Sequence, residues 1–208
     1  MELNKIYNED CREILPLLPD KSIDLVLTDP PYGITKSDWD KVPDKYIFDE
    51  LFRVSKEQLF FGGQFFDLPR KEGWIVWSKK QDWMTKPFSQ SQVNEAELIW
   101  ISKPIKTKVI EYHVWGNVEG FKGEKLKPDY KRPKNIFTSQ KPIRLISYII
   151  ETFFSDCDII LDPFLGSGTT AVACINTNRH FIGCELDKGY YDIAVKRVEE
   201  ARHKVKLL

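Results

Sequence analysis

The stretch at residues 158–177, DIILDPFLGSGTTAVACINT, joins an apolar run, a loop with two glycines and a run of small residues. A continuous apolar run is typical of a buried parallel strand. The small residues that follow Gly168 favour a helix packed closely on a sheet. Between the two, glycines allow a ligand to approach the backbone. The order of strand, glycine loop and helix predicts a nucleotide-binding loop in an α/β domain.

The loop also limits which nucleotide it binds. It lacks the third glycine of the dinucleotide fingerprint and the Gly-Lys-Ser/Thr of a phosphate-binding loop. The next apolar run, RHFIGCELD at 179–187, ends near Glu185, an acid placed to accept the hydroxyls of a ribose. A ligand with a ribose but without phosphates points to S-adenosylmethionine.

The rest of the chain alternates between strand and helix patterns. The sequence predicts strands at 3–7, 23–28, 58–63, 74–78 and 97–101, and helices at 10–17, 44–56, 141–154 and 188–205. This alternation is typical of an α/β domain with a mostly parallel sheet. At 208 residues, the chain fits one domain, or one domain with an insertion.

A second motif follows the strand predicted at 23–28. In LVLTDPPYGI (25–34), Asp29, Pro30, Pro31 and Tyr32 come directly after the apolar run. Two prolines remove two backbone donors and keep the chain extended, so they form a stiff platform. The platform carries an acid and an aromatic ring at the carboxyl end of a strand, where α/β sheets bind ligands. Taken alone, Asp-Pro-Pro is equally compatible with a proline-rich turn.

Residues 102–134 differ from the rest in charge. They contain nine Lys or Arg residues against four acids, a net charge of +5, whereas the whole chain has 31 of each sign. Aromatic residues are interleaved with the basic ones: Tyr112, Trp115, Phe121 and Tyr130. This combination is compatible with a nucleic-acid-binding surface and equally with a solvated insertion.

The composition argues against several classes of protein. We find no apolar run of about 20 residues and no apolar signal-peptide core at the start, so we predict a cytoplasmic protein without a membrane span. Cys11, Cys157, Cys174 and Cys184 form no Cys-x-x-Cys pair, and the three histidines have no ligand-like spacing. We therefore expect buried, reduced cysteines and no metal site.

Together the motifs resemble those of the β-class DNA amino-methyltransferases, which modify adenine N6 or cytosine N4. Asp29–Tyr32 near the start and Phe164–Gly168 near the end match the family's catalytic and cofactor motifs in that order. FTSQKPIRL (137–145) resembles its Thr-x-Lys-Pro motif, although Ser139 and Gln140 depart from the commonest wording. NEDCREILPLLPDKSIDLVLTDPPY (8–32) resembles its opening.

The resemblance implies a fold and a cofactor site. The fold is a Rossmann-like sheet of seven mostly parallel strands with one reversed strand, circularly permuted so that the catalytic half comes first and the cofactor half last. The cofactor is S-adenosylmethionine. The implied cofactor-binding residues are Asp10, Cys11, Asp29, Lys141, Asp162, Phe164, Gly166, Ser167, Gly168, Thr169 and Glu185.

The resemblance also implies the chemistry. An exocyclic amine is a poor nucleophile because its lone pair is delocalised into the ring. Asp29 and the Pro30 carbonyl would accept its N–H groups, Pro31 would hold their geometry and Tyr32 would stack on the base. The methyl group would then move by direct in-line displacement, without a covalent enzyme intermediate.

A base inside a duplex cannot reach such a site, so the resemblance implies a flipped-out adenine in DNA. The segment 102–134 would be an inserted target-recognition region, with Lys125, Lys127, Lys131 and Arg132 as its DNA-binding residues. The main alternative is an N4-cytosine enzyme, which more often has Ser in place of Asp29. A second alternative is a nucleic-acid-binding module without catalytic activity. A homodimer and a cognate restriction nuclease are both compatible with the family.

Overall fold

The computed structural model describes residues 1–79, 95–115, 118–122 and 140–206. Its strands are β1 (Lys5–Tyr7), β2 (Ile23–Thr28), β3 (Ser55–Phe61), β4 (Ile75–Ser78), β5 (Ala96–Ile101), β6 (Lys108–Trp115), β7 (Val118–Phe121), β8 (Ile159–Asp162) and β9 (His180–Cys184). Its α-helices are α1 (Cys11–Ile14), α2 (Lys45–Val54), α3 (Ile143–Phe153), α4 (Thr169–Asn176) and α5 (Lys188–Lys206). Two short 3₁₀ helices are η1 (Leu15–Leu17) and η2 (Gly63–Phe65).

The described strands form one sheet in the order β1-β9-β8-β2-β3-β5-β4-β6-β7. Strands β1, β9, β8, β2 and β3 are parallel to one another, and β5 runs antiparallel to both of its neighbours. Leaving out β6 and β7, the sheet has seven strands with β5 reversed. The predicted fold class is therefore confirmed, including its permuted order, because β8 and β9 come last in the chain but lie beside β2.

Strands β6 and β7 extend this sheet at one edge. They come from the segment 102–134, where β6 pairs parallel with β4 and antiparallel with β7. Tyr112 on β6 is fully buried, and Trp77 donates a hydrogen bond to its carbonyl oxygen (2.7 Å). Counting Tyr112 among the aromatic residues of a DNA-binding surface was therefore wrong, since its ring packs in the core.

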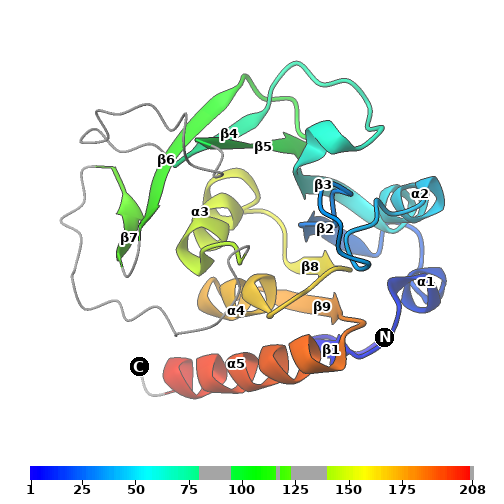
Figure 1. The fold of residues 1–208 in the computed structure, drawn as a ribbon. Helices are drawn as coiled ribbons and strands as arrows, with labels where there is room; N and C mark the ends of the chain where they lie inside the picture. Colours follow the sequence, from blue (N-terminus) through cyan, green and yellow to red (C-terminus); the bar gives the residue numbers. More distant parts are fainter. Residues whose placement is uncertain (80–94, 116–117, 123–139, 207–208) are drawn as a thin grey trace.

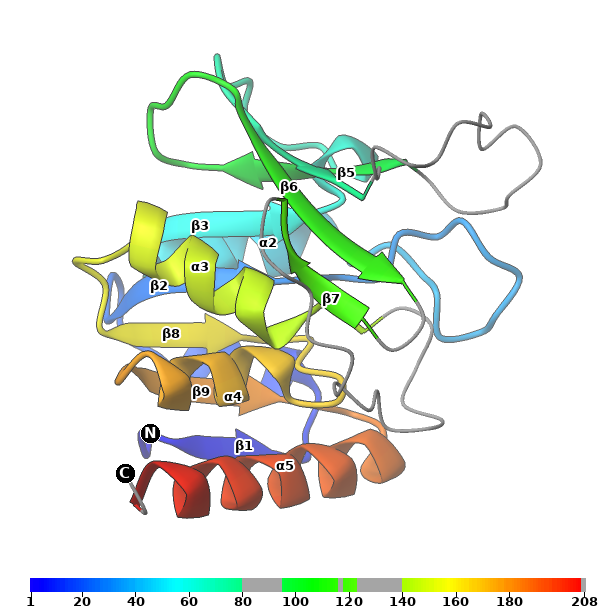
Figure 2. The ribbon, with the colours of Figure 1, turned by 90° about the vertical axis from the view of Figure 1, so that its left-hand side faces the viewer.

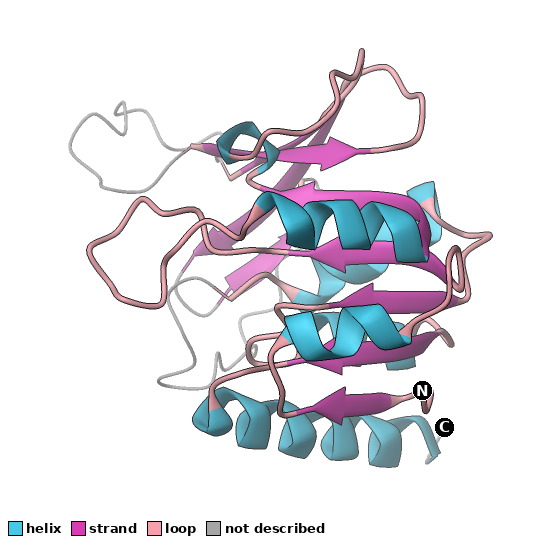
Figure 3. Ribbon diagram, turned by 90° about the vertical axis from the view of Figure 1, so that its right-hand side faces the viewer, coloured by secondary structure: helices cyan, strands magenta, loops and turns pink. Residues whose placement is uncertain are grey.

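Helices cover both faces of the sheet (Figures 1 and 3). Helices α3, α4 and α5 lie on one face, and α1 and α2 lie on the other. The helix α2 is amphipathic, with Ile47, Phe48, Leu51 and Val54 buried, but Tyr46, which its spacing also assigns to the apolar face, is 50% exposed. Each helix thus covers apolar strand residues and leaves its polar side to solvent.

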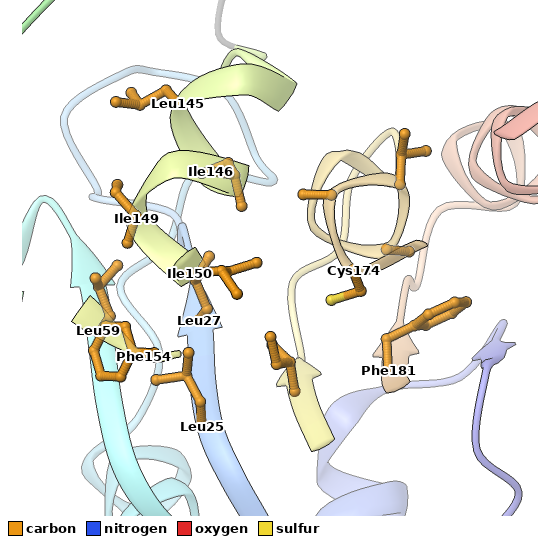
Figure 4. Close-up of a cluster of buried hydrophobic side chains, with 14 of the residues drawn as sticks. Leu25, Leu27, Leu59, Leu145, Ile146, Ile149, Ile150, Phe154, Cys174 and Phe181 are labelled. Carbon is orange, nitrogen blue, oxygen red and sulfur yellow. The ribbon is translucent and has the colours of Figure 1, made fainter. Parts of the chain in front are cut away.

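The core beneath α3 joins the two halves of the chain. Figure 4 shows Ile146 and Ile150 of α3 above Leu25 and Leu27 of β2, and all four side chains are at most 1% exposed. Fully burying an aliphatic side chain of this size contributes about 1.5–3 kcal/mol. Because α3 immediately precedes β8, this packing fixes the cofactor half against the catalytic half.

Three further findings concern the described residues. No helix there is long and apolar enough to cross a membrane. No group of three or more His, Cys, Asp or Glu side chains there could hold a metal ion. All four cysteines are free and buried, and burial raises the pKa of the Cys157 thiol to about 11, so it is protonated at neutral pH.

Candidate active site

The predicted site residues within the described part of the chain gather at one edge of the sheet. The parallel strands β1, β9, β8 and β2 lie side by side, and each is followed by one of the motifs. Asp10 and Cys11 follow β1, Glu185 follows β9 and Asp29 follows β2. Figure 2 shows these strands ending at the same side of the molecule. The carboxyl-end site expected for an open α/β sheet is thereby built from four strands.

Asp29 lies at the centre of a cluster of polar side chains. One carboxylate oxygen accepts a hydrogen bond from the Tyr32 hydroxyl, and the other lies 2.5 Å from the Lys141 Nζ. The Lys141 side chain is 10% exposed and that of Asp29 is 30% exposed. Lys141 comes from the residues just before α3, 112 positions further along the chain. The Asp29 carboxylate is thus held between a neutral and a cationic donor.

A second carboxylate shares the lysine. Glu97 on β5 forms ion pairs with Lys79 and, at 3.5 Å, with Lys141. The oxygen that faces Lys141 makes no hydrogen bond within the described part of the chain, so this contact acts through charge alone. Burial lowers the pKa of Lys141, but Asp29 and Glu97 outweigh burial and raise it above the usual lysine value. Lys141 therefore carries a positive charge at neutral pH.

The Tyr32 ring packs against Gly62 and the short helix η2 that follows it. It stacks on Phe65 of η2, with the ring centroids 5.0 Å apart and the planes 22° from parallel. A Cβ atom built on Gly62 would lie 2.3 Å from the Tyr32 ring, and Gly62 has a φ of +63°. Only glycine suits this position, because any side chain would meet the ring and would strain the backbone. Gly62 and Phe65 were not predicted, although FFGGQFF at 60–66 contains both.

The backbone after the two prolines is held by an acid from further along the loop. Pro30 is buried and Pro31 half-buried. The buried carboxylate of Asp40 accepts hydrogen bonds from four consecutive N–H groups, those of residues 32–35, at 2.6–3.0 Å. Burial raises the pKa of Asp40, but these N–H groups outweigh burial and hold it below its usual value. Asp40 therefore stays ionised and fixes the loop that carries Tyr32.

The glycine loop between β8 and α4 is held by two charged residues. The Glu185 carboxylate accepts the N–H of Gly166 at 2.7 Å and that of Asp187 at 2.8 Å. Arg197 of α5 donates to the Ser167 hydroxyl at 2.7 Å and to its carbonyl oxygen. Burial raises the pKa of Glu185. The loop is therefore shaped by contacts from β9 and α5, and Arg197 was missed because no motif marks it.

The two loop glycines have different surroundings. Both have a positive φ, +56° at Gly166 and +84° at Gly168. A Cβ built on Gly166 meets no atom within 4 Å, whereas one on Gly168 would lie 2.9 Å from the Cβ of Ala194. Gly168 is thus required for the packing of α5 on the loop. Gly166 borders open space, as expected of a glycine that a ligand approaches.

Asp162 lies beneath this loop. Its carboxylate accepts hydrogen bonds from the hydroxyls of Thr28 and Thr170, both at 2.6 Å, and from the Phe164 N–H at 3.1 Å. Burial raises its pKa to about 6. Since Asp162 is only 4% exposed, it supports the loop and joins β8 to β2 and α4.

The remaining predicted cofactor residues lie around the same strand ends. Asp10 caps α1 through the Arg12 N–H and forms an ion pair with the Arg12 side chain. Cys11 and Cys184 are buried in one apolar cluster, against which the half-buried Phe164 packs. Thr169, at the start of α4, is buried and its hydroxyl makes no hydrogen bond in the described residues. This hydroxyl and the space at Gly166 are compatible with a bound polar ligand.

Part of the predicted site lies outside the residues that the structure describes. Lys125, Lys127, Lys131 and Arg132 lie outside the described residues, and so do Thr138 and Ser139 of the Thr-x-Lys-Pro motif. Lys141 of the same motif does reach the site. Among the residues that the sequence did not single out, Glu97 and Asp40 make the largest contributions to the geometry of the catalytic motif.

Comparisons with known proteins agree with this geometry. A family model described as DNA methylase, covering N6 and N4 enzymes, matches residues 45–196. The Type II methyltransferase M.BglII of Bacillus subtilis is 29% identical over an alignment of 249 positions including gaps, which covers 92% of this chain and 68% of that protein. The predicted family is therefore confirmed.

Solved structures with the same fold include a complex with the predicted cofactor. The M1.HpyAVI–SAM complex has a TM-score of 0.58 and 28% sequence identity, and the match covers 93% of this chain and 98% of that one. The PvuII methyltransferase, described as cytosine-N4-specific, has a TM-score of 0.61 at 17% identity, covering 93% and 85% of the two chains. At that identity the PvuII likeness shows the fold alone.

Proposed function

The chain belongs to the DNA methylase family of N6 and N4 amino-methyltransferases, and from that premise we propose that it is a site-specific adenine-N6 methyltransferase. S-adenosylmethionine is the cofactor, and it supplies a methyl group from its sulfonium as the carbon–sulfur bond breaks. The observation that carries the proposal is the Asp29–Tyr32 pair at the end of β2, one strand away from the glycine loop at the end of β8.

The cofactor would be held by groups at the ends of β8, β9 and β1. Gly166 offers the space for close approach, Glu185 a carboxylate for the ribose hydroxyls and Thr169 a hydroxyl. Phe164, Asp10 and Cys11 would border the adenine part. Ser167, Gly168 and Asp162 would act by holding the loop, since their contacts are with Arg197, Ala194 and the two threonines.

The catalytic residues would act on the amine of the target base. The Asp29 carboxylate accepts one amine N–H and the Pro30 carbonyl accepts the other, which makes the nitrogen more nucleophilic. Each oxygen of Asp29 already accepts one intramolecular hydrogen bond and has a second lone pair, so the amine can bind beside a donor or replace it. Tyr32 is the donor that can leave without removing a charge. Lys141 then stays on the other oxygen and holds the carboxylate in place, and the methylated nitrogen loses its proton to solvent.

Adenine is favoured over cytosine by Asp29, since N4-cytosine relatives more often have Ser there. The target adenine would be flipped out of a duplex, because a base that stays stacked and paired could not bring its amine to a side chain in such a site. DNA contact by Lys125, Lys127, Lys131 and Arg132 stays a prediction, as do a homodimer, a partner nuclease and a cytoplasmic location.

The test is expression of the chain in a host without DNA methylation, followed by mass spectrometry of the nucleosides. We expect N6-methyladenine, and none in cells that express Asp29→Ala at the same level. Detection of N4-methylcytosine instead would show that the protein is an N4-cytosine methyltransferase. Cofactor binding by the purified protein without either modified base would favour a silent binding module.

A further inference from the structure

The loop between β2 and α2 carries an unusual set of exposed side chains. It extends past the carboxyl ends of the strands, on the same side as the candidate active site (Figure 2). Trp39 is 70% exposed, Ile34 61% and Val42 46%. Tryptophan is a residue that folding usually covers. Three large apolar side chains exposed on one loop, residues 29–44, therefore indicate a surface that a partner covers.

This loop is braced along its length. The carboxylate of Asp40, next to Trp39, accepts hydrogen bonds from the N–H groups of residues 32–35. These bonds fold the later part of the loop back onto its beginning. The Asp40 N–H donates to the Ser37 carbonyl at 3.0 Å, and the Lys41 N–H to the Trp39 carbonyl at 3.1 Å. Trp39 thus lies on a turn that hydrogen bonds to the backbone hold together. Its side chain is exposed on this ordered turn.

The brace connects Trp39 to the catalytic motif. One of the four N–H groups bound by Asp40 belongs to Tyr32, the residue whose hydroxyl contacts Asp29. The buried carboxylate therefore couples the position of an exposed tryptophan to that of the residue proposed to stack on the target base. The charged residues next to Trp39 are the exposed Lys36, Asp38 and Lys41 and the buried Asp40, so the two lysines are the cations that this turn presents to solvent.

We propose that Trp39 inserts into the DNA base stack and fills the gap that the flipped target base leaves. This inference rests on the proposed function. A flipped base leaves its neighbours unstacked, and proteins that distort DNA commonly place an apolar wedge between such bases. A tryptophan ring stacks on any base, so it suits a gap whose neighbours vary. Lys36 and Lys41 would lie against the flanking phosphates.

The experiment compares Trp39→Ala with the wild-type protein on three substrates. They are a duplex with the target adenine paired, the same duplex with an abasic site opposite the target, and the single strand; the site is that found modified in host DNA. On the paired duplex we expect Trp39→Ala to lose roughly 10- to 100-fold in kcat/KM. On the other two substrates the loss should fall to about threefold or less, since the base there flips without a wedge.

Controls separate a wedge from other roles. Trp39→Phe should keep most of the activity because its ring still stacks. Leu17→Ala is the control for the loss of an exposed apolar side chain, because Leu17 has a similar exposure (65%) but lies on η1, away from this loop. Affinity for S-adenosylmethionine should be unchanged in all three variants. A 2-aminopurine at the target position should become fluorescent with the wild type and less so with Trp39→Ala.

Three results would overturn the inference. The first is wild-type activity of Trp39→Ala on the paired duplex. The second is an equal loss on all three substrates, which would mean that Trp39 only holds the loop. The third is a change of Trp39→Ala from dimer to monomer in sedimentation, which would assign the surface to a second copy of the chain. A wild-type protein that methylates no DNA would instead refute the proposed function.

Discussion

The catalytic end of β2 and the glycine loop after β8 lie on neighbouring strands, and in each a carboxylate accepts two hydrogen bonds, but from different kinds of donor. At the end of β2, Asp29 already has two side-chain donors, Tyr32 and Lys141. At the glycine loop, the contacts of Glu185 and Arg197 hold the backbone, and Gly166 still borders open space. The carboxylate of the first region is held by side chains that can rearrange when a substrate binds, whereas that of the second holds backbone groups in place in advance.

This difference follows from what each region binds. A cofactor present throughout the reaction cycle benefits from a preformed loop, since less conformational entropy is lost on binding. A carboxylate that awaits a substrate amine would be costly to leave unpaired in a half-buried site. The Tyr32 hydroxyl and the Lys141 ammonium remove that cost until the amine arrives.

The largest effect is expected from Asp29→Ala. Methyl transfer should fall by at least about a thousandfold, some 4 kcal/mol, because the amine loses its carboxylate acceptor. Cofactor affinity should stay within about tenfold, or 1.4 kcal/mol, because the glycine loop is held independently. Methylation kinetics measure the rate of methyl transfer, and calorimetric titration measures the cofactor affinity. Retained activity would remove Asp29 from the mechanism. Asp29→Asn, which keeps the shape, tests whether the charge itself is required.

Gly166→Val should weaken cofactor binding by about a hundredfold or more, roughly 2.7 kcal/mol, because the side chain enters the space that the ligand needs. Gly168→Ala is the matched control, since its methyl group would meet Ala194. The control should lower the free energy of unfolding by about 1–3 kcal/mol and affect cofactor affinity less. Calorimetric titration and thermal melts of both variants distinguish the positions. If both variants weakened cofactor binding equally, the different roles assigned to Gly166 and Gly168 would be wrong.

Glu185→Ala should weaken cofactor binding by about 1–3 kcal/mol, because the ribose hydroxyls would lose their acceptor. The same change leaves the N–H groups of Gly166 and Asp187 without their carboxylate, so the melting temperature should fall as well. Glu185→Gln keeps an acceptor oxygen and should lose less in both measurements. An unchanged dissociation constant in Glu185→Ala would place the ribose elsewhere.

Glu97→Gln is expected to give the smallest effect, a decrease in kcat of about fivefold or less, roughly 1 kcal/mol. Its sharper consequence concerns pH. A lysine whose pKa is raised in the folded protein stabilises it at every pH below the usual lysine value, and this contribution is lost as the pH rises through the folded value. Without Glu97 the folded pKa of Lys141 should be lower, so the stabilisation should be smaller and its loss complete at a lower pH.

Activity and melting temperature of Glu97→Gln, measured from neutral to alkaline pH, would show this shift of the alkaline limit. Glu95→Gln is the matched control, because Glu95 is exposed and lies just before the same strand. If both variants have the alkaline limit of the wild type, Glu97 does not act on Lys141.

The sequence by itself determined the parts whose signals are local. An apolar run followed by two glycines predicts a strand and a ligand-binding loop wherever it occurs, and Asp29–Tyr32 predicts a stiff acid-bearing turn for the same reason. The permuted sheet was predicted from the resemblance to the methyltransferase family, which the order of the motifs carries. Lys141 was predicted as a site residue from its motif, but as a cofactor contact; its pairing with Asp29 was not predicted.

Only the tertiary structure decided how these parts meet. Glu97 reaches Lys141 because β5 is inserted, reversed, between β3 and β4, and Asp40 reaches the N–H groups of residues 32–35 because its loop folds back. The same holds for the two loop glycines, which look alike in sequence, although α5 packs on only one of them. Such contacts depend on distances between residues far apart in the chain, and a single sequence carries no local pattern that encodes them.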